Sequence, residues 1–168
     1  RGDVAIGGDD ARLILLTAIS NDAPEDVVAS ILESAHGLDV NEAGDYKTLL
    51  SDDVYESRDA GLVLRNRERH KRRTEKDVTP LILAAERGLV QIVKLLIQVG
   101  ADPNLAPYTA LAYRGAPPPL RPLQVAAECA KWPVMGALLD GGARFSSREE
   151  SDRTLELAMG SLGKLLAE

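Results

Sequence analysis

The chain has 168 residues, enough for one domain, and it carries a formal net charge of −6. This acidic balance argues against general nucleic-acid binding, which needs Lys and Arg to neutralise phosphates. The single cysteine, Cys129, excludes an internal disulfide and indicates a reducing compartment, so we expect an intracellular protein of the cytoplasm, the nucleus or both. No apolar stretch is long enough to span a bilayer, and we expect no membrane insertion. Because the chain begins with Arg1 rather than methionine, we expect a fragment of a longer protein.

The N-terminal region, residues 11–41, has the pattern of two short helices joined by a turn. Apolar residues recur at helical spacing over residues 13–18 and again over residues 27–32. Asp9 or Asp10 is available to cap the first helix from Ala11. The region therefore predicts a diverged helix pair.

Residues 42–78 depart from the helix-pair pattern and form a first insertion. The first half is acidic, whereas residues 64–73 are densely basic. Two interpretations stay open: a solvated loop, or a protruding element that contacts a partner or serves as a nuclear-import signal. A third hypothesis is nucleic-acid contact through Arg65–Arg73, despite the acidic charge of the whole chain.

The next stretch, residues 79–104, has the strongest pattern in the chain. Pro80 suits the first turn of a helix because its fixed φ is already helical and its missing N–H costs nothing there. Gly88 ends that helix, and apolar residues at helical spacing predict a second one. Gly100 stands just past the end of the second helix, the usual place for a residue at positive φ.

The C-terminal half repeats this pattern after a second insertion. Residues 105–120 hold three consecutive prolines and predict an extended finger. Residues 121–145 then copy residues 79–104 when Pro122 is aligned with Pro80. We interpret Trp132 as a residue that packs under the turn between the two helices of this copy. Residues 152–168 predict a truncated last unit that begins at Thr154 and includes a loop over residues 160–164.

The segment Thr79–Asn104 carries two recognisable motifs, TPL-x-LAA-x-x-G and IVKLL-x-x-x-GADPN. These motifs resemble the ankyrin-repeat consensus, whose period is about 33 residues. Ile82 departs from the consensus, because the family usually has a histidine there. Arg121–Ala143 resembles the same consensus, and the two terminal units diverge further from it. The resemblance implies an all-α fold, a single-domain ankyrin-repeat solenoid of about four helix-turn-helix units with two long insertions.

The resemblance also implies a function. Members of the family bind another macromolecule in a concave groove lined by exposed positions of the first helices and by turn fingers. We therefore expect a non-catalytic protein–protein interaction module whose partner is another protein. Carried over by position, the partner-binding residues are Lys76, Val78, Glu86, Arg87, Glu128 and Cys129. The long finger adds three residues of types that are common in binding hot spots, Tyr108, Tyr113 and Arg114.

Catalytic and metal-binding patterns are missing from the sequence. His36 and His70 have no cysteine or second histidine at ligand spacing. The segment Gly160–Lys164 lacks the full spacing of a phosphate-binding loop. We therefore expect no enzyme activity, no cofactor and no metal site. One alternative stays open, in which the repeats regulate or target a larger enzyme or channel.

Overall fold

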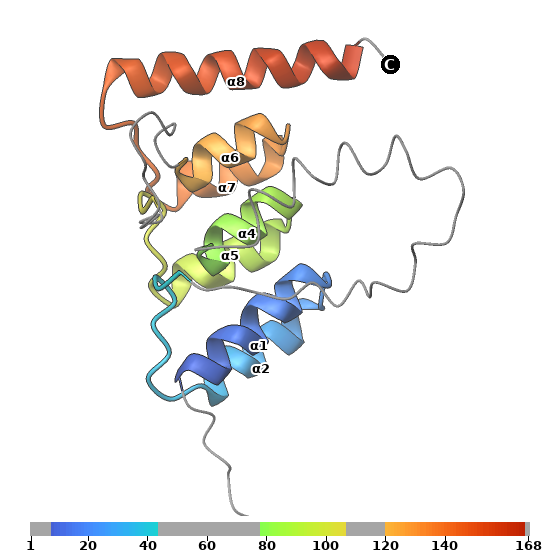
Figure 1. The fold of residues 1–168 in the computed structure, drawn as a ribbon, viewed down its shortest axis with the longest axis vertical. Helices are drawn as coiled ribbons and strands as arrows, with labels where there is room; N and C mark the ends of the chain where they lie inside the picture. The colour runs from blue at the N-terminus through green and yellow to red at the C-terminus, as the bar shows by residue number, and fades with distance from the viewer. Residues whose placement is uncertain (1–7, 44–77, 107–119, 167–168) are drawn as a thin grey trace, which may run out of the picture.

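The computed structural model describes residues 8–43, 78–106 and 120–166, which form a stack of short helices (Figure 1). Most of both insertions, including the basic residues 64–73, lies outside the described residues. The all-α prediction is confirmed, because the described elements are helices that pack in pairs. In chain order they are α1 (Gly8–Ser20), α2 (Glu25–Ser34), α4 (Pro80–Arg87), α5 (Val90–Gln98), α6 (Pro122–Glu128), α7 (Trp132–Asp140) and α8 (Arg148–Leu166).

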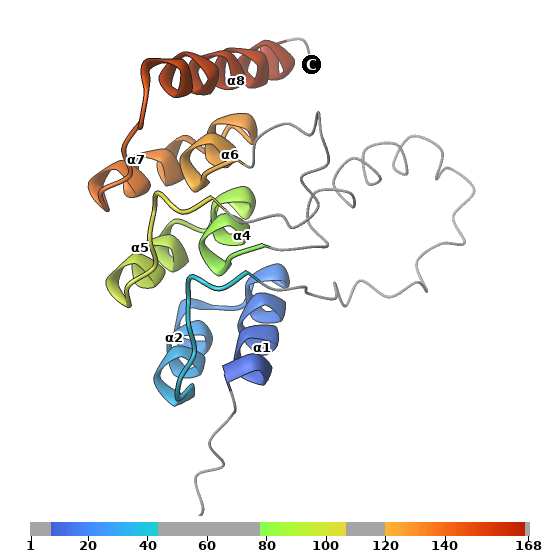
Figure 2. The same ribbon diagram turned by 60° about the vertical axis from the view of Figure 1, so that its left-hand side comes forward.

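The stack has two columns (Figure 2). The first helices α1, α4, α6 and α8 each pack on the one before, and the second helices α2, α5 and α7 form the other column. In the first three units, each first helix also packs against its own second helix. The core lies between the columns and is built from fully buried leucines and valines of all three units, among them Leu15, Leu83, Leu96 and Leu138.

The ends of α4 follow from local sequence. The hydroxyl of Thr79 accepts a hydrogen bond from the Ile82 amide at 3.3 Å, and Pro80 follows in the first turn. Gly88 ends the helix in the left-handed conformation, with φ of 84°. Both predicted boundaries are therefore confirmed, because each depends on a residue whose backbone preference is strong by itself.

The loops that leave the second helices also lie in a column, which we call the loop edge (residues 35–43, 99–106 and 141–147). Two asparagine side chains join these loops to one another. Asn41 of the first loop bonds the second loop, and Asn104 of the second loop bonds the third. These side chains fix the spacing of consecutive units at the loop edge.

The last helix differs from the prediction. We expected a helix start at Thr154 and a loop over residues 160–164, but α8 is one 19-residue helix from Arg148 to Leu166. Thr154 lies inside it, and its hydroxyl donates to the Glu150 carbonyl oxygen at 2.8 Å. Thr154 and Ala158 are buried, on the helix that packs on α6. This packing outweighs the weak helix preference of the glycines in its second half.

Glu150 anchors the start of α8. Its Oε2 atom accepts hydrogen bonds from the Ser146 amide at 2.7 Å and the Ser146 hydroxyl at 2.5 Å, and it pairs with Arg121 at 3.2 Å. Burial alone would raise the pKa of Glu150, but the Ser146 donors and the Arg121 charge outweigh it and lower that pKa below its ordinary value. Arg121 directly precedes α6, so this cluster ties α8 to the unit beneath it.

The first helix also begins earlier than predicted. α1 starts at Gly8, so Asp9 and Asp10 lie inside the helix and neither is its N-cap. A Cβ atom at Gly8 would lie 3.0 Å from the Gly37 carbonyl oxygen. The absence of a side chain at residue 8 therefore allows the helix start to approach the first loop closely.

Candidate functional site

Four of the predicted contact residues gather at the ends of two first helices. Glu86 and Arg87 are the last residues of α4, Glu128 is the last residue of α6, and Cys129 follows it. All four side chains are half-buried. Since α4 and α6 stack side by side in the same sense, these ends lie one above the other, next to the turns that lead into the second helices (Figure 1). We call this side of the molecule the turn edge (residues 20–24, 86–89 and 128–132).

The strongest polar contact of the turn edge joins the first two units. The Arg87 guanidinium donates two hydrogen bonds to Asp22, from Nε to Oδ1 at 2.9 Å and from Nη2 to Oδ2 at 2.6 Å. These bonds outweigh the effect of burial and hold the pKa of Asp22 below its ordinary value. Arg87 therefore links α4 to the α1–α2 turn, in addition to presenting part of its side chain to solvent.

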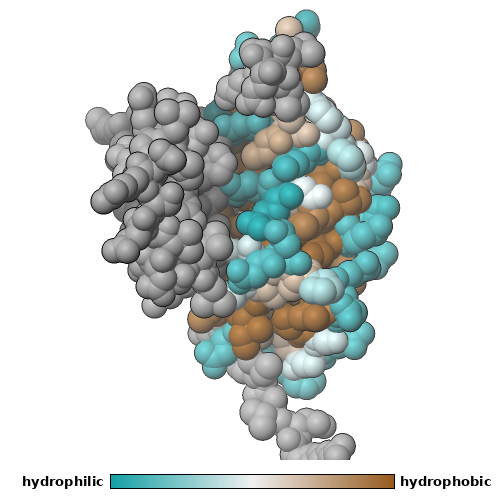
Figure 3. All heavy atoms as spheres, turned by 90° about the vertical axis from the view of Figure 1, so that its right-hand side faces the viewer, coloured by the Kyte–Doolittle hydropathy of each residue, from teal (hydrophilic) through white to brown (hydrophobic). Residues whose placement is uncertain are grey.

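A second basic side chain continues the column toward the third unit. A Cβ atom at Gly88 would lie 2.9 Å from Cδ of Lys131, so the Lys131 stem passes over the α4–α5 turn. The charge of Lys131 also contributes to the lowered pKa of Asp22. Asp22, Arg87 and Lys131 thus form a charged column that runs across three successive turns. Figure 3 views the molecule from this side, where hydrophobic and hydrophilic side chains alternate.

The sequence-based prediction missed both Asp22 and Lys131. The sequence analysis gave Asp22 no role in a contact, and 65 residues separate it from Arg87. Asp22, Gly88 and Ala130 have corresponding positions in the turns between paired helices, where all three adopt positive φ. An alignment of the turns would have placed Asp22 beside the end of the next first helix.

Two predictions about individual residues need correction, and others lie outside the described residues. Val78 is 4% exposed and belongs to the core, so its side chain does not line a surface. It directly precedes the N-cap Thr79, a position from which an apolar side chain packs back onto the helix. Trp132, interpreted as a packing residue, is 38% exposed at the start of α7. Four further residues lie outside the described ranges: Lys76, Tyr108, Tyr113 and Arg114.

The helices α4 and α6 offer little other surface. In α4 every residue from Pro80 to Ala85 is buried, and in α6 every residue from Pro122 to Ala127 is buried. Exposure in these two helices is therefore confined to their last residues, Glu86, Arg87 and Glu128. Any molecule that contacts α4 and α6 directly has to meet them at the turn edge.

Metal sites and membrane spans are both missing from the described residues. Within residues 8–43, 78–106 and 120–166, no group of three or more His, Cys, Asp or Glu side chains is placed to hold a metal ion. None of the described helices is long and apolar enough to cross a membrane.

A family model adds independent information about the second unit. The model for the ankyrin repeat matches residues 76–106, which span α4, α5 and the loop that follows them. No curated protein matches the chain. The matched range contains the predicted repeat Thr79–Asn104, and the paired helices on both sides of it extend the same architecture. Residues 76–106 of this chain therefore match an ankyrin repeat.

Proposed function

We propose that this domain is a non-catalytic module that binds another protein through its turn edge and the adjoining concave side of the first helices. Ankyrin repeats are generally protein-binding modules, and the repeat at residues 76–106 carries that expectation to this chain. The observation that supports the turn edge is the confinement of exposed surface on α4 and α6 to Glu86, Arg87 and Glu128.

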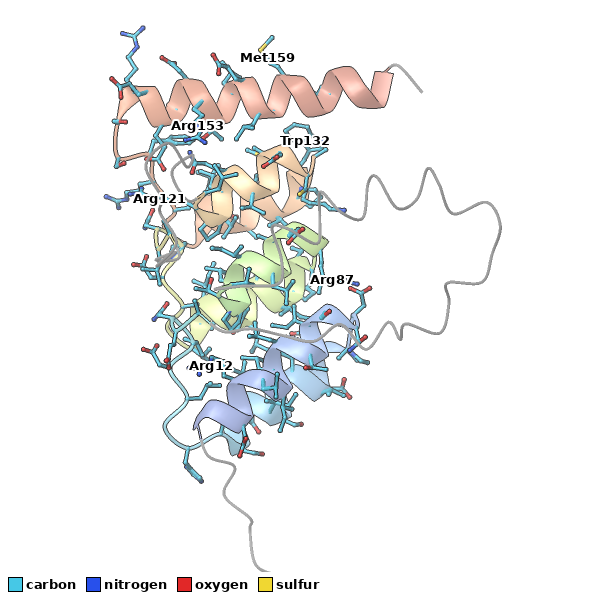
Figure 4. All side chains as sticks on the ribbon, in the orientation of Figure 1. Arg12, Arg87, Arg121, Trp132, Arg153 and Met159 are labelled. Atoms are coloured by element: carbon cyan, nitrogen blue, oxygen red, sulfur yellow. The ribbon has the colours of Figure 1, made fainter. Side chains whose placement is uncertain are left out.

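The chemistry of the turn edge suits a polar protein surface with an apolar anchor. Glu86 and Glu128 supply acidic groups, and Asp22, Arg87 and Lys131 form the charged column beside them. Trp132 adds an exposed aromatic side chain at the same edge (Figure 4). Aromatic residues and arginine are the types that most often dominate the energy of a protein interface.

A charge-reversal experiment tests the site. Affinity capture from a cell extract is performed with the wild-type domain and with Glu86→Lys and Glu128→Lys variants. The matched control is Glu33→Lys, which makes the same charge change at an exposed residue of α2. We expect both turn-edge variants to lose proteins that the wild type and the control retain. Loss of the same proteins by all three variants, or by none, contradicts the site.

A second pair of variants separates the role of Arg87 in binding from its role in the stack. Arg87→Asp alone breaks the contact with Asp22, whereas Asp22→Arg combined with Arg87→Asp restores an ion pair of reversed orientation. We expect the double variant to recover stability but not partner binding. Recovery of both properties would mean that Arg87 acts only within the fold.

Two finer predictions accompany this proposal. We place the interaction inside the cell, in the cytoplasm, the nucleus or both, because the one cysteine indicates a reducing environment. Residues Arg65–Arg73 stay a predicted nucleic-acid contact or import signal, and a binding assay repeated at rising salt concentration tests the first of these, since phosphate contacts weaken steeply with ionic strength.

A further inference from the structure

An exposed serine lies between two arginines in the third loop of the loop edge. Residues 144–148 read Arg-Phe-Ser-Ser-Arg, so Ser146 has one arginine two positions before it and another two positions after it. Arg144, Ser146 and Arg148 are all exposed, and the Arg148 side chain is 94% exposed. Protein kinases select their substrates in part by the charges around the acceptor residue. A serine between two arginines suits a kinase whose substrate groove is acidic.

The backbone around Ser146 has a form that a kinase can bind. Residues 143–147 lie between α7 and α8 and belong to neither helix. Because this segment is not helical, it can enter a groove that accepts extended peptides without the unwinding of a helix. The Arg144 amide anchors the loop upstream of the serine, since it donates to the Asn104 side chain at 2.7 Å.

The Ser146 hydroxyl contacts the carboxylate that anchors α8. It donates to Oε2 of Glu150 at 2.5 Å, and the Ser146 amide donates to the same oxygen at 2.7 Å. Arg121, at the start of α6, pairs with this oxygen at 3.2 Å (Figure 4). The side chains of Glu150 and Arg121 are only 12% and 28% exposed, so water and salt screen their charges only in part. The contact thus pairs one cation with one anion.

A phosphate group on Ser146 would reverse this balance. The modified oxygen has no proton to donate, and the phosphate carries a charge of about −1.5 to −2 at pH 7. Glu150 is ionised at that pH, because its pKa lies below the ordinary value of 4.5. Arg121 supplies one positive charge, which does not neutralise both anions. The α8 dipole favours an anion at this end, but it is equivalent to only about half an elementary charge, so the repulsion is the larger effect.

We propose that Ser146 is the acceptor site of an arginine-directed serine/threonine kinase, and that its phosphorylation loosens the start of α8. The γ-phosphoryl group of ATP passes to Oγ of Ser146. The bond between phosphorus and Oγ forms, the bond to the ADP oxygen breaks, and the hydroxyl proton leaves through the general base of the kinase. The site lies on the loop edge and uses no turn-edge residue, so the inference does not depend on the proposed function.

The neighbouring Ser147 provides an internal comparison. It is also exposed, but Glu149 stands two residues after it, where Ser146 has Arg148. The Ser147 hydroxyl accepts a hydrogen bond from the Glu150 amide at 3.2 Å. Phosphate oxygens are acceptors, so modification of Ser147 would keep this kind of contact, whereas modification of Ser146 removes a donor. The two serines therefore differ both as substrates and in the effect of modification.

Phosphorylation of the purified domain tests the acceptor site. The full 168-residue chain is incubated with ATP and the catalytic domain of a kinase that phosphorylates a synthetic peptide of residues 140–152. Mass spectrometry locates the phosphate. We expect modification at Ser146, its loss in Ser146→Ala and its retention in Ser147→Ala. Arg144→Ala and Arg148→Ala should each slow the reaction by about fivefold or more, because each removes one charge that the kinase recognises.

Hydrogen exchange tests the effect on α8. The Ser151 amide donates to the Ser147 carbonyl oxygen at 3.2 Å in the first turn of the helix. Phosphorylation of Ser146 should accelerate exchange at Ser151 by about tenfold or more, whereas Ser146→Ala, which removes the hydroxyl without adding charge, should accelerate it by about threefold at most. The phosphorylated Glu150→Gln variant should exchange more slowly than the phosphorylated wild type, because the repulsion is absent.

Three results would overturn the proposal. One is a folded domain that takes up no phosphate at Ser146 under conditions that modify the peptide of residues 140–152. Another is modification of Ser147 in place of Ser146. The third is unchanged exchange at Ser151 after Ser146 is phosphorylated, or exchange in the phosphorylated Glu150→Gln variant that is as fast as in the phosphorylated wild type.

Discussion

Asn41 and Asn104 make the same pair of hydrogen bonds in successive loops. The Asn41 side chain donates to the Gly100 carbonyl oxygen at 3.1 Å and accepts from the Asp102 amide at 2.7 Å. The Asn104 side chain donates to the Gly142 carbonyl oxygen at 3.1 Å and accepts from the Arg144 amide at 2.7 Å. Each amide group therefore bridges its own loop to the next one.

The series ends at the third loop. Ser146 corresponds to Asn104 in the alignment that places Gly142 on Gly100, and its amide and hydroxyl donate to Glu150 at the start of α8. The contact that joins loops in the first two units is thus replaced by one that fixes the start of the last helix. Among the described helices, α7 is the second helix that immediately precedes this replacement.

Removal of one bridging asparagine should destabilise the whole stack. We expect Asn104→Ala to lower the free energy of unfolding by about 1–2 kcal/mol, because it removes two hydrogen bonds between units. Asn104→Asp should lower the free energy of unfolding by less than Asn104→Ala does, because an acceptor for the Arg144 amide remains. Urea unfolding followed by circular dichroism measures both. The control is Asn21→Ala, whose side chain bonds only the Thr17 carbonyl of the preceding helical turn, and it should change stability by less than about 0.5 kcal/mol.

The turn edge contains a position where glycine is favoured but absent. Ala130 has φ of 55°, and Gly88 occupies the corresponding place one unit earlier with φ of 84°. The left-handed conformation costs a non-glycine residue about 1–2 kcal/mol, which exceeds the entropy cost of glycine. We expect Ala130→Gly to stabilise the domain by about 0.5–1 kcal/mol and Gly88→Ala to destabilise it. A thermal unfolding scan that ranks the two variants in the opposite order contradicts the turn geometry.

Two glycines of the third unit should respond oppositely to alanine. At Gly141 a Cβ atom would lie 2.5 Å from Cδ1 of Ile97 and 3.2 Å from the Ala137 carbonyl oxygen. Gly141→Ala should therefore destabilise the α5–α7 contact by about 1–3 kcal/mol. Gly136 lies within α7 with open space around it, so Gly136→Ala should stabilise by up to about 1 kcal/mol. Equal melting temperatures for the two variants would show that the end of α7 does not pack against Ile97.

Stability should fall in acid through two identified carboxylates. The folded pKa values of Asp22 and Glu150 lie below their ordinary values of 3.8 and 4.5. As the pH falls, the two carboxyls therefore bind protons at a higher pH in the unfolded chain than in the folded one. Their stabilisation of the fold is complete above the ordinary pKa values and is lost as the pH falls through the folded pKa values. In the Glu150→Gln variant, the free energy of unfolding should fall less steeply than in the wild type between about pH 6 and about pH 3. An unchanged pH dependence of stability in Glu150→Gln would contradict the role of the Glu150 contacts with Ser146 and Arg121.

Local sequence predicted the middle of the fold well. Pro80 and Gly88 mark helix ends because each restricts or frees its own backbone, and these signals need no tertiary structure. The single helix α8 was missed because its glycines favour a loop, and its order comes from packing on α6, a contact that the local pattern does not contain.

The candidate site was predicted less completely than the fold. The alignment of Pro122 with Pro80 correctly placed Glu86 and Glu128 at corresponding helix ends. The contact between Arg87 and Asp22 was not predicted, because it depends on how closely two units stack across a long insertion. Val78 was assigned to the surface by position, although its apolar side chain packs in the core.

The central claim is that consecutive helix pairs stack with their loops in register, and hydrogen exchange of two loop amides tests it most directly. The Asp102 and Arg144 amides donate to asparagine side chains of the preceding loops. We expect Asn41→Ala to accelerate exchange at Asp102 by about tenfold or more and leave Arg144 unchanged, and Asn104→Ala to do the reverse. Wild-type exchange at both amides as fast as in an unfolded chain, or variants without this selectivity, would contradict the stack.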